Sequence, residues 1–387
     1  MTTTTNPAAE LKRVLGTFFA ALGVILLVLL GLRFLTLEDG PATVLSWIYR
    51  RIGLAGEAEA IDQLGMNPVM SKLIIAAVAL AVGIAGIWAL YAIFNKLIEL
   101  LPDRATSVLR PWVFLFPALF LLGFWLLLPG ILTVRDSFTL DGGFVENYKF
   151  VFTDPDMQVA LRNNVVWLIV ATGGAVIIGL VIAILVDRVR WEKTSKTLVF
   201  IPMAISMVGA SVIWRFMYWW QPEGETQIGL LNAIWTWFGN TPVAFMQTIP
   251  LNTFALILIM VWLMTGFAMV VLSAAIKNVP QELIEAARID GATEVEIFFR
   301  VIMPNIRPSI ITVTTTIFIA ILKVFDIVFV MTGGRFETDV VANRMFTEMF
   351  KFRNFGRASS LAVILLIAVI PIMVVNVRGL KKQGIGA

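Results

Sequence analysis

The sequence contains no cysteine and no histidine among its 387 residues. These absences exclude disulfide bonds, thiolate chemistry, imidazole ligation of zinc or haem, and Ser-His or Cys-His nucleophilic pairs. Charge is also scarce, because only 14% of the residues are Asp, Glu, Lys or Arg, against about 25% in a typical soluble chain. Only carboxylates, lysine, tyrosine and hydroxyl groups remain for chemistry, so the composition disfavours an enzyme.

The sequence is correspondingly rich in apolar residues. They make up 59% of the chain, whereas a soluble chain has about 45–50%. A larger soluble core does not explain this excess, because the surface around that core would still need polar cover. The apolar residues must therefore face lipid, and the sequence predicts an all-α, polytopic membrane protein.

The chain contains eight apolar stretches long enough to cross a bilayer. A helix needs roughly 20 apolar residues to span the hydrocarbon. The predicted spans are residues 15–35, 73–94, 112–134, 165–186, 198–218, 251–276, 310–331 and 359–377.

Basic residues predict the orientation. If both termini are cytoplasmic, the larger share of the 30 lysine and arginine residues falls on the inner side, as the positive-inside rule requires. Segment 335–357 carries five basic residues on the outer side. Docking of a partner and ordinary solvation are both open explanations for that segment.

The inner segment between the sixth and seventh predicted spans has signals for two short helices. Pro280 suits the first turn of a helix, and Gly291 suits the C′ position, where a left-handed residue is needed. Thr293 and Glu296 have the spacing of a capping box that begins a second helix. Pro304 then marks the exit into the next span. We expect two short helices on the cytoplasmic face, with a bend at Gly291.

The first of these helices has an apolar face outside the membrane. Leu283, Ile284 and Ala287 share that face at helical spacing, and Ala286 is small enough for close approach. Such a face either packs beneath its own helical bundle or fits another protein.

The same segment carries a family pattern: Glu-Ala-Ala, three residues, Gly, nine residues, and an Ile-x-Leu-Pro-like ending. It is present here as Glu285-Ala286-Ala287, Gly291 and Val301-Ile302-Met303-Pro304. Val and Met are conservative departures from the usual Ile and Leu. With its full spacing, the segment resembles the signature of permease subunits of bacterial and archaeal ATP-binding-cassette (ABC) importers.

Other stretches from residue 112 onward resemble the maltose-type sugar permeases of that family. They are Phe144, Glu146-Asn147-Tyr148, Asp154-Pro155, Ala160 to Asn164, Gly229 to Asn232, Lys323, Phe325-Asp326 and Thr332-Gly333-Gly334. The usual proline after the glycine pair is replaced by Arg335. The resemblance implies a cytoplasmic tail at 1–14 and two additional spans with an outer loop at 15–110. It also implies a six-span core of the type I importer fold at 111–380, with coupling helices at 280–304.

The resemblance also implies a mechanism and a set of partners. The chain has no Gly-Lys pair and hence no phosphate-binding G-x-x-x-x-G-K-[ST] loop, so ATP and Mg²⁺ would bind to a separate pair of ATPase subunits. The other partners would be a second permease, an extracytoplasmic solute-binding protein and the lipid of a prokaryotic cytoplasmic membrane; nucleic acid is not expected. If the residues have the roles of their counterparts in the family, Glu285 would contact the ATPase. Ala286 and Ala287 would allow close packing, Gly291 would allow the bend, and Pro304 would fix the exit.

Candidates for the substrate pathway are polar or aromatic residues inside the predicted spans, where a charged group is costly. They are Trp262, Phe267, Lys323 and Asp326. Lys323 and Asp326 are three residues apart, so they could pair on one helix face. Such a pair could bind neighbouring helices together or line the pathway. The cargo implied is a sugar, in particular a di- or oligosaccharide, and a glycerol phosphate is the alternative.

Three other classes compete with this hypothesis. A secondary transporter predicts inverted repeats and coupling-ion carboxylates at the bilayer midplane, for which the sequence offers only Asp326. A membrane-bound transferase needs clustered carboxylates, but Asp290, Glu294 and Glu296 are spaced as helix caps. A purely structural assembly factor explains the spans and leaves the 280–304 segment unexplained.

Overall fold

The computed structural model describes scattered positions between residues 80 and 96, then residues 103–187 and 189–382. The described residues form helices and contain no strand, which confirms the predicted all-α class. The predicted tail at 1–14 and span at 15–35 lie outside the described residues, as does most of the region up to residue 102.

The chain divides into two compact units, Met1–Pro129 and Gly130–Ala387. In chain order the described helices are α5 (Asp103–Leu122), η1 (Gly123–Leu127), α6 (Leu128–Thr139), α7 (Gly143–Thr153), α8 (Pro155–Val186), α9 (Glu192–Phe200), η2 (Ile201–Ala204), α10 (Met207–Met217), α11 (Leu230–Trp237), α12 (Leu251–Lys277), α13 (Gln281–Ile289), α14 (Glu294–Ile297), η3 (Phe298–Ile302), α15 (Met303–Leu322), α16 (Asp326–Met331), α17 (Val341–Phe346), η4 (Thr347–Lys351) and α18 (Phe355–Lys382).

Several described helices are long and apolar enough to cross a bilayer, so the chain is an integral membrane protein. The continuous ones cover Phe114–Thr139, Pro155–Val186, Leu251–Lys277 and Glu294–Leu322. A bent pair, α9–η2 with α10, provides a fifth span, and Phe355–Pro371 is a shorter apolar helix. The total of eight spans stays a prediction, because the N-terminal region lies outside the described residues.

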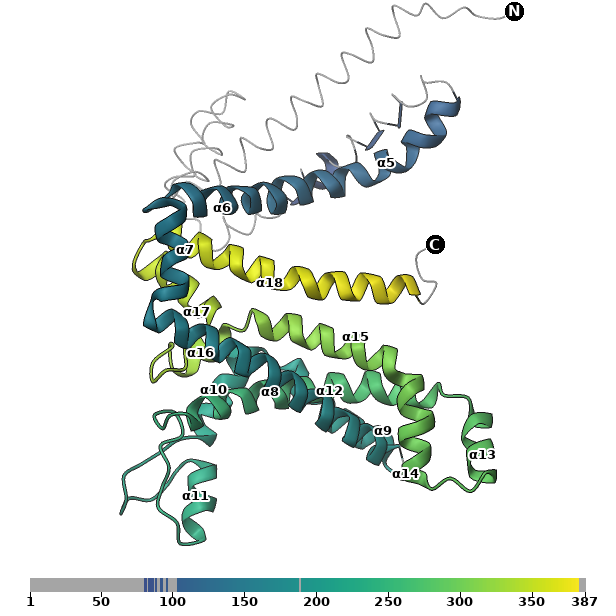
Figure 1. Cartoon of the computed structure of the whole chain (residues 1–387), viewed down its shortest axis with the longest axis vertical. Helices are drawn as coiled ribbons and strands as arrows, with labels where there is room; N and C mark the ends of the chain where they lie inside the picture. Colours follow the sequence, from purple (N-terminus) through teal and green to yellow (C-terminus); the bar gives the residue numbers. More distant parts are fainter. Residues whose placement is uncertain are drawn as a thin grey trace, which may run out of the picture. The chain divides into compact units, whose positions relative to one another are not determined.

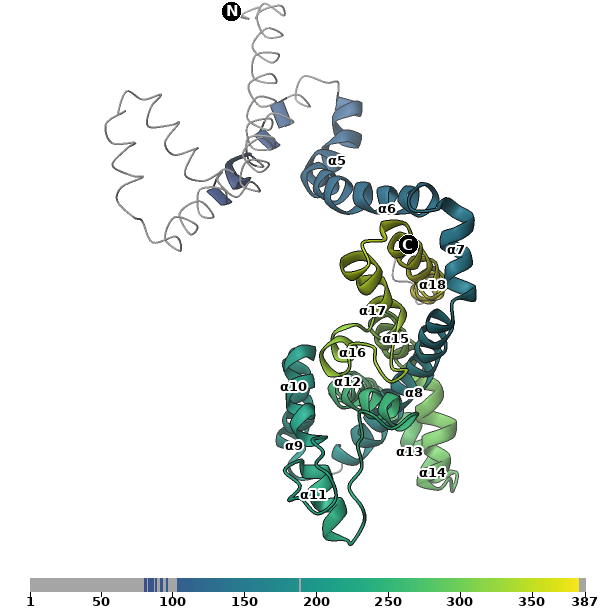
Figure 2. The same cartoon turned by 90° about the vertical axis from the view of Figure 1, so that its left-hand side faces the viewer.

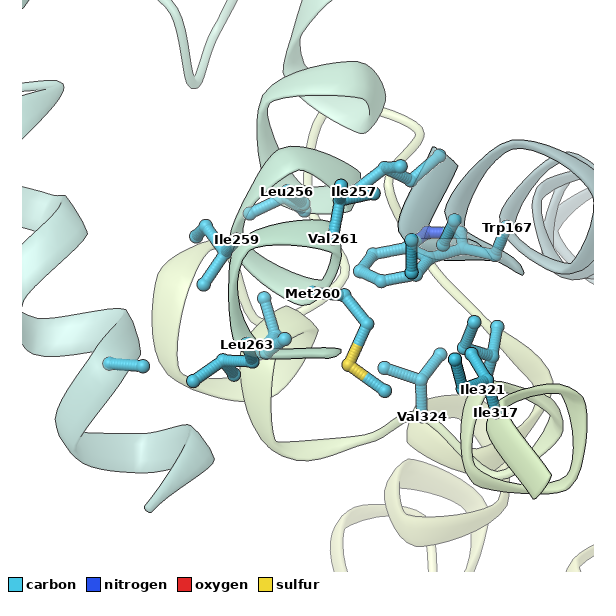
Figure 3. Close-up of a cluster of buried hydrophobic side chains, with 14 of the residues drawn as sticks. Trp167, Leu256, Ile257, Ile259, Met260, Val261, Leu263, Ile317, Ile321 and Val324 are labelled. Atoms are coloured by element: carbon cyan, nitrogen blue, oxygen red, sulfur yellow. The ribbon is translucent and has the colours of Figure 1, made fainter. Parts of the chain in front are cut away.

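The core of the second unit is the contact between α8 and α12. Gly179 on α8 lies so close to α12 that a Cβ atom there would be 2.6 Å from Cβ of Ala268. Trp167 of α8 and Met260 of α12 are fully buried beside Ile321 of α15, as Figure 3 shows. Close packing of this kind gives a rigid interior in which a single added methyl group is felt.

The predicted span at 198–218 is not one continuous helix, and that prediction is wrong. The helix pair α9–η2 and α10 meets at an angle of 102°. Pro202 lies in the short 3₁₀ helix η2, and Ile205 is extended. Ser206 then begins α10, where its Oγ atom accepts a hydrogen bond from the N–H of Gly209 at 3.0 Å. Proline lacks the N–H that a continuing helix would use, and serine at the N-cap favours the beginning of a new helix.

The predicted span at 310–331 is broken as well. Helix α15 ends at Leu322 and α16 begins at Asp326. The break frees backbone groups that need partners away from water. Asn164 of α8 supplies one partner, because its Nδ2 donates to the carbonyl of Leu322 at 3.2 Å, and its Oδ1 also accepts the N–H of Val341 at the start of α17 at 2.8 Å. Lys323 and Asp326 therefore do not share one helix face, contrary to the prediction.

Helices α8, α12 and α15 run between two distinct ends of the second unit (Figure 1). One end carries α13 and α14, and the other carries α11, α16 and α17 (Figures 1 and 2). The segment at 280–304 thus lies at the end opposite the loops that surround α11 and α17.

Gly179→Ala should destabilise the second unit, because the new methyl group meets the backbone and side chains of α12. We expect a loss of about 1–3 kcal/mol, the usual range for an overpacked core. Gly173→Ala is the matched control on the same helix, since a Cβ atom there meets nothing within 4 Å. Thermal unfolding of the detergent-solubilised protein is the measurement. Equal midpoints for the two variants would contradict the close α8–α12 contact.

Candidate functional site

The 280–304 segment follows directly from the core helix α12. Only residues 278–280 separate Lys277, the last residue of α12, from Gln281, the first of α13. Pro280 is the N-cap of α13, one position before the first turn in which it was predicted. Val279 is 8% exposed and holds this short connection against the unit.

Gly291 makes the predicted bend. Its φ is +83°, in the left-handed region that favours glycine. The N–H of Gly291 donates to the carbonyl of Arg288 at 3.1 Å, and the N–H of Ala292 donates to that of Ala287 at 3.0 Å. These two bonds form a Schellman motif, which satisfies carbonyls at the end of α13. The prediction for Gly291 is confirmed.

The predicted capping box is also confirmed. The N–H of Glu296 donates to Oγ1 of Thr293 at 3.3 Å, and the N–H of Thr293 donates to Oε2 of Glu296 at 3.0 Å. An ion pair between Arg288 and Glu294, with 3.0 Å between Nη2 and Oε1, then joins α13 to α14 across the bend. The bend is therefore fixed by backbone and side-chain contacts together.

Pro304 does not separate a second short helix from the next span, and this prediction is wrong. Helices α14, η3 and α15 run on as one 29-residue helix, Glu294–Leu322. Just before the proline the helix widens into a π turn, where the N–H of Met303 donates to the carbonyl of Phe298. The wider turn relieves the contact that a proline ring makes with the carbonyl four residues earlier.

The segment leaves an apolar surface uncovered by the rest of the described chain. Helix α13 has no buried side chain. Leu283 is 45% exposed, Ile289 86% and Val295 65%. Glu285 and Ala286 are exposed and Ala287 is half-buried. Within the described part of the chain, the Glu285 carboxylate makes no hydrogen bond or ion pair. Of the predicted apolar face, Leu283 is exposed whereas Ile284 and Ala287 are half-buried, so the described residues cover that face only in part.

Trp262 lines a cavity of about 430 Å³ at the broken span. The walls come from α8, α9, η2, α10 and α12, and Trp214 of α10 meets Trp262 edge to face at 5.8 Å between ring centroids. Thr265 supplies a hydroxyl, which donates to the carbonyl of Val261 at 2.7 Å. The lining is otherwise apolar except for backbone groups.

The structure does not bring the four pathway candidates together. Phe267 is half-buried against the core and does not line the cavity. Lys323 is exposed and Asp326 is half-buried, at the break between α15 and α16. No ion pair joins Lys323 to Asp326 among the described residues. What this site brings together is the two tryptophans at the bend of the broken span.

A family profile described as "Binding-protein-dependent transport system inner membrane component" matches residues 175–379, more than half of the chain. The chain belongs to this family. The match covers the cavity, the 280–304 segment and most of α18, so the resemblance to importer permeases is confirmed.

Two curated relatives agree with this assignment. The "Osmoprotective compounds uptake permease protein GgtC" of Synechocystis is 54% identical over 276 residues, which cover 70% of this permease and 99% of the relative. The "Alpha-glucoside transport system permease protein AglF" of Rhizobium meliloti is 45% identical over 289 residues, which cover 73% and 86%.

A solved structure shares the fold of the permease. It is the bacterial alginate ABC transporter in complex with alginate pentasaccharide-bound periplasmic protein. The likeness has a TM-score of 0.63 at 20% identity, and it covers 73% of this chain and 98% of that one.

Sequence reasoning missed the buried asparagines that hold the loops around α7 and α17 of the permease. Asn163 Nδ2 donates to the carbonyls of Glu337 and Asp339 at 2.6 and 2.9 Å. Asn147 Nδ2 donates to the carbonyl of Leu140 at 2.9 Å. Asn147 and Asn163 fall in the stretches that carry the maltose-type resemblance, but no local pattern says which carbonyl an amide will reach.

Four of the five basic residues in segment 335–357, namely Arg335, Arg344, Lys351 and Arg357, have partners within the chain. Arg344 is mostly buried, pairs with Glu348 at 3.1 Å and lies 3.3 Å from Asp156. The guanidinium of Arg357 lies 4.3 Å from the ring centroid of Phe150. Structural contacts therefore account for part of the charge in this outer segment.

Gly291→Ala should loosen the 280–304 segment, because a non-glycine residue in the left-handed region costs about 1–2 kcal/mol. A Cβ atom at Gly291 meets nothing within 4 Å, so this backbone cost is the expected effect. Amide hydrogen exchange at Ala292 should speed up about fivefold or more. Gly291→Asn is the control, since asparagine tolerates this region better. Unchanged exchange in the alanine variant would contradict the conformational requirement.

Proposed function

We propose that this permease is one of two membrane-spanning subunits of an importer that carries a sugar across the prokaryotic cytoplasmic membrane. A separate pair of ATPase subunits drives it, and an extracytoplasmic solute-binding protein delivers the cargo. The cargo is a di- or oligosaccharide or a smaller glucoside. The chain itself is a non-catalytic subunit, and ATP and Mg²⁺ bind to the ATPase partners.

The uncovered surface of the 280–304 segment carries this proposal. It combines exposed apolar side chains, a bend fixed by the Schellman motif at Gly291 and the exposed carboxylate of Glu285. An apolar helix face with a polar rim suits a groove on another protein. Ala286 and Ala287 allow close approach, while the continuous helix beyond Pro304 would carry a push from the segment into α15.

The orientation follows from this assignment. If the 280–304 segment meets ATPase subunits, its end of the second unit is cytoplasmic. The loops around α11 and α17 then face the outside, where a solute-binding protein would dock. The N- and C-termini are assigned to the cytoplasm, in line with the distribution of basic residues.

The cargo class rests on the relatives and on the chemistry of the tryptophan cavity. GgtC is named for osmoprotective compounds and AglF for alpha-glucosides. Aromatic side chains in a preformed cavity suit the apolar faces of a sugar ring, and a few polar groups fix its orientation. We assign Trp262 and Phe267 to the apolar part of the pathway and Lys323 with Asp326 to its polar part at the helix break.

Glu285→Lys and Gly291→Pro should uncouple the importer. The first reverses a charge on the exposed face of α13, and the second is incompatible with a φ of +83°. In proteoliposomes that hold the full complex, we expect solute uptake to fall about tenfold or more, as a loss of 1.4 kcal/mol in productive contact would give. Membrane insertion should be unaffected.

Glu223→Lys is the control for this experiment, because it makes the same charge change on an exposed glutamate of the outer loop before α11. It should leave ATPase co-purification unchanged, and only that readout is compared, because the loop before α11 lies where a solute-binding protein would dock. Wild-type uptake in both loop variants would contradict the docking role of the segment.

Trp262→Ala should weaken the transport of a sugar without affecting ATPase binding. The substitution removes a large aromatic face from the cavity, and we expect the half-saturation concentration for uptake to rise about tenfold. Trp125→Ala is the matched control, since Trp125 is 61% exposed on η1 and belongs neither to the cavity lining nor to the loops around α11. Labelled disaccharides, short oligosaccharides, alpha-glucosides and glycerol phosphate form the panel. Equal effects of the two tryptophan variants, or uptake of glycerol phosphate alone, would contradict the assigned pathway or cargo.

A further inference from the structure

A network of charged side chains joins three helices at the end of the unit that carries the 280–304 segment. This charge network consists of Asp187, Glu192, Lys196, Ser273 and Lys277. Asp187 caps α8, Glu192 and Lys196 lie on α9, and Ser273 and Lys277 lie in the last turns of α12. The function proposed above assigns no role to these residues.

Lys196 is the centre of the charge network. Its Nζ atom lies 2.6 Å from Oδ1 of Asp187 and 2.6 Å from Oε1 of Glu192, and it also donates to Ser273. Lys277 pairs with Glu192 and lies 3.8 Å from Asp187. The Lys196 side chain is only 20% exposed and that of Asp187 only 15%, so solvent screens this pair less than a surface pair. Two carboxylates and two ammonium groups balance each other.

A second contact fixes α9 to α12 two turns farther along. A Cβ atom at Gly266 would lie 2.5 Å from the carbonyl oxygen of Val199 and 2.8 Å from Cα of Phe200. Gly266 and Ser273 are seven residues apart, about 10 Å along a helix. Helix α9 is therefore held to α12 at two separated points, which makes the two helices move as one body.

This body lies between the 280–304 segment and the tryptophan cavity. On one side, three residues connect Lys277 to α13. On the other side, Leu198 and Val199 of α9 form part of the cavity wall opposite Trp214 of α10. Helix α10 meets α12 through Trp214 and Trp262 but is bound mainly to α16, where Arg215 donates to the carbonyl of Val330. A displacement of α9 relative to α10 would concentrate at the 102° bend between them and change the cavity.

We propose that the charge network is the positioning link that makes α9 follow the 280–304 segment, so that a push from the ATPase reshapes the tryptophan cavity at the bend at Ile205 and Ser206. This link rests on the proposed function, because it presupposes that the segment receives the push. Lys196 is its main positioning residue, since it contacts α8, α9 and α12 at once. Without it, α13 still docks, but only the Gly266 contact and the Lys277–Glu192 pair hold α9 to α12, so α9 follows α12 less closely.

Lys196→Met tests the link. The variant keeps most of the side-chain volume and removes the charge. In proteoliposomes with the full complex, ATPase co-purification should be unchanged, while solute transported per ATP hydrolysed should fall about fivefold or more, the lower end of typical coupling effects. Lys196→Arg keeps the charge and should restore most of the ratio. Lys193→Met, on an exposed lysine of the same helix, is the matched control and should match the wild type.

A distance measurement provides the second readout. Because the chain has no cysteine, Leu198→Cys on α9 and Phe216→Cys on α10 can be spin-labelled as a unique pair; the two native side chains are 63% and 64% exposed. Trapping ATP in the complex should shift the distance between the labels in the wild-type background, and the shift should be smaller with Lys196→Met. If Lys196→Met fails to assemble, Ser273→Ala, which removes the hydrogen bonds to Lys196 and Asp187 but no charge, should reduce the shift.

The outcomes separate this inference from the proposed function. A wild-type complex that neither binds an ATPase nor takes up a sugar would overturn the proposed function itself. A wild-type complex that couples normally, with the same transport ratio and label shift in Lys196→Met, would overturn the charge network alone.

Discussion

The close contact between α8 and α12 is the constraint on which the rest of the second unit depends. Gly179 lets the two helices approach until no room remains for a side chain between them. Around this pair, α15 packs on one side and α9 on the other, and α12 leads within three residues into α13. Because the pair is rigid, the exposed 280–304 segment has a fixed base against which a partner could push.

The two interrupted spans are the places where helices beside the rigid α8–α12 pair can change direction. Each interruption frees backbone groups that lipid cannot satisfy, and side chains form hydrogen bonds near both interruptions. Ser206 caps α10 after the 102° bend. Asn164 binds the carbonyl of Leu322 at the end of α15 and the N–H of Val341 at the start of α17. Both interruptions also place polar or aromatic side chains near irregular backbone. Trp214 and Trp262 meet at the first, and Lys323 and Asp326 flank the second. Broken helices that line a cavity are a recurrent device of membrane transporters.

Local signals explain what the sequence could predict. The bend at Gly291 and the capping box at Thr293 depend on residues within a few positions of each other, and both were predictable from spacing alone. The breaks were not predicted, because the stretches 198–218 and 310–331 are apolar on average despite Ser206, Lys323 and Asp326, and average hydropathy does not register a change of direction. The Pro304 prediction failed for a related reason: a π turn absorbs the proline without ending the helix. The Asn164 clamp and the charge network join residues that are 77 to 177 positions apart, so no local pattern could reveal them.

The central claim, that the 280–304 segment docks on an ATPase, can be tested in native membranes with a single introduced cysteine, since the chain has none of its own. Ile289 is 86% exposed on α13, and Ile228, in the loop before α11, is 71% exposed. With a short reagent that carries one thiol-reactive and one photoreactive group, Ile289→Cys should yield a cross-linked product that contains the ATPase subunit, and Ile228→Cys should yield none. A product from Ile228→Cys alone, or none from Ile289→Cys in a complex that transports solute, would contradict the account.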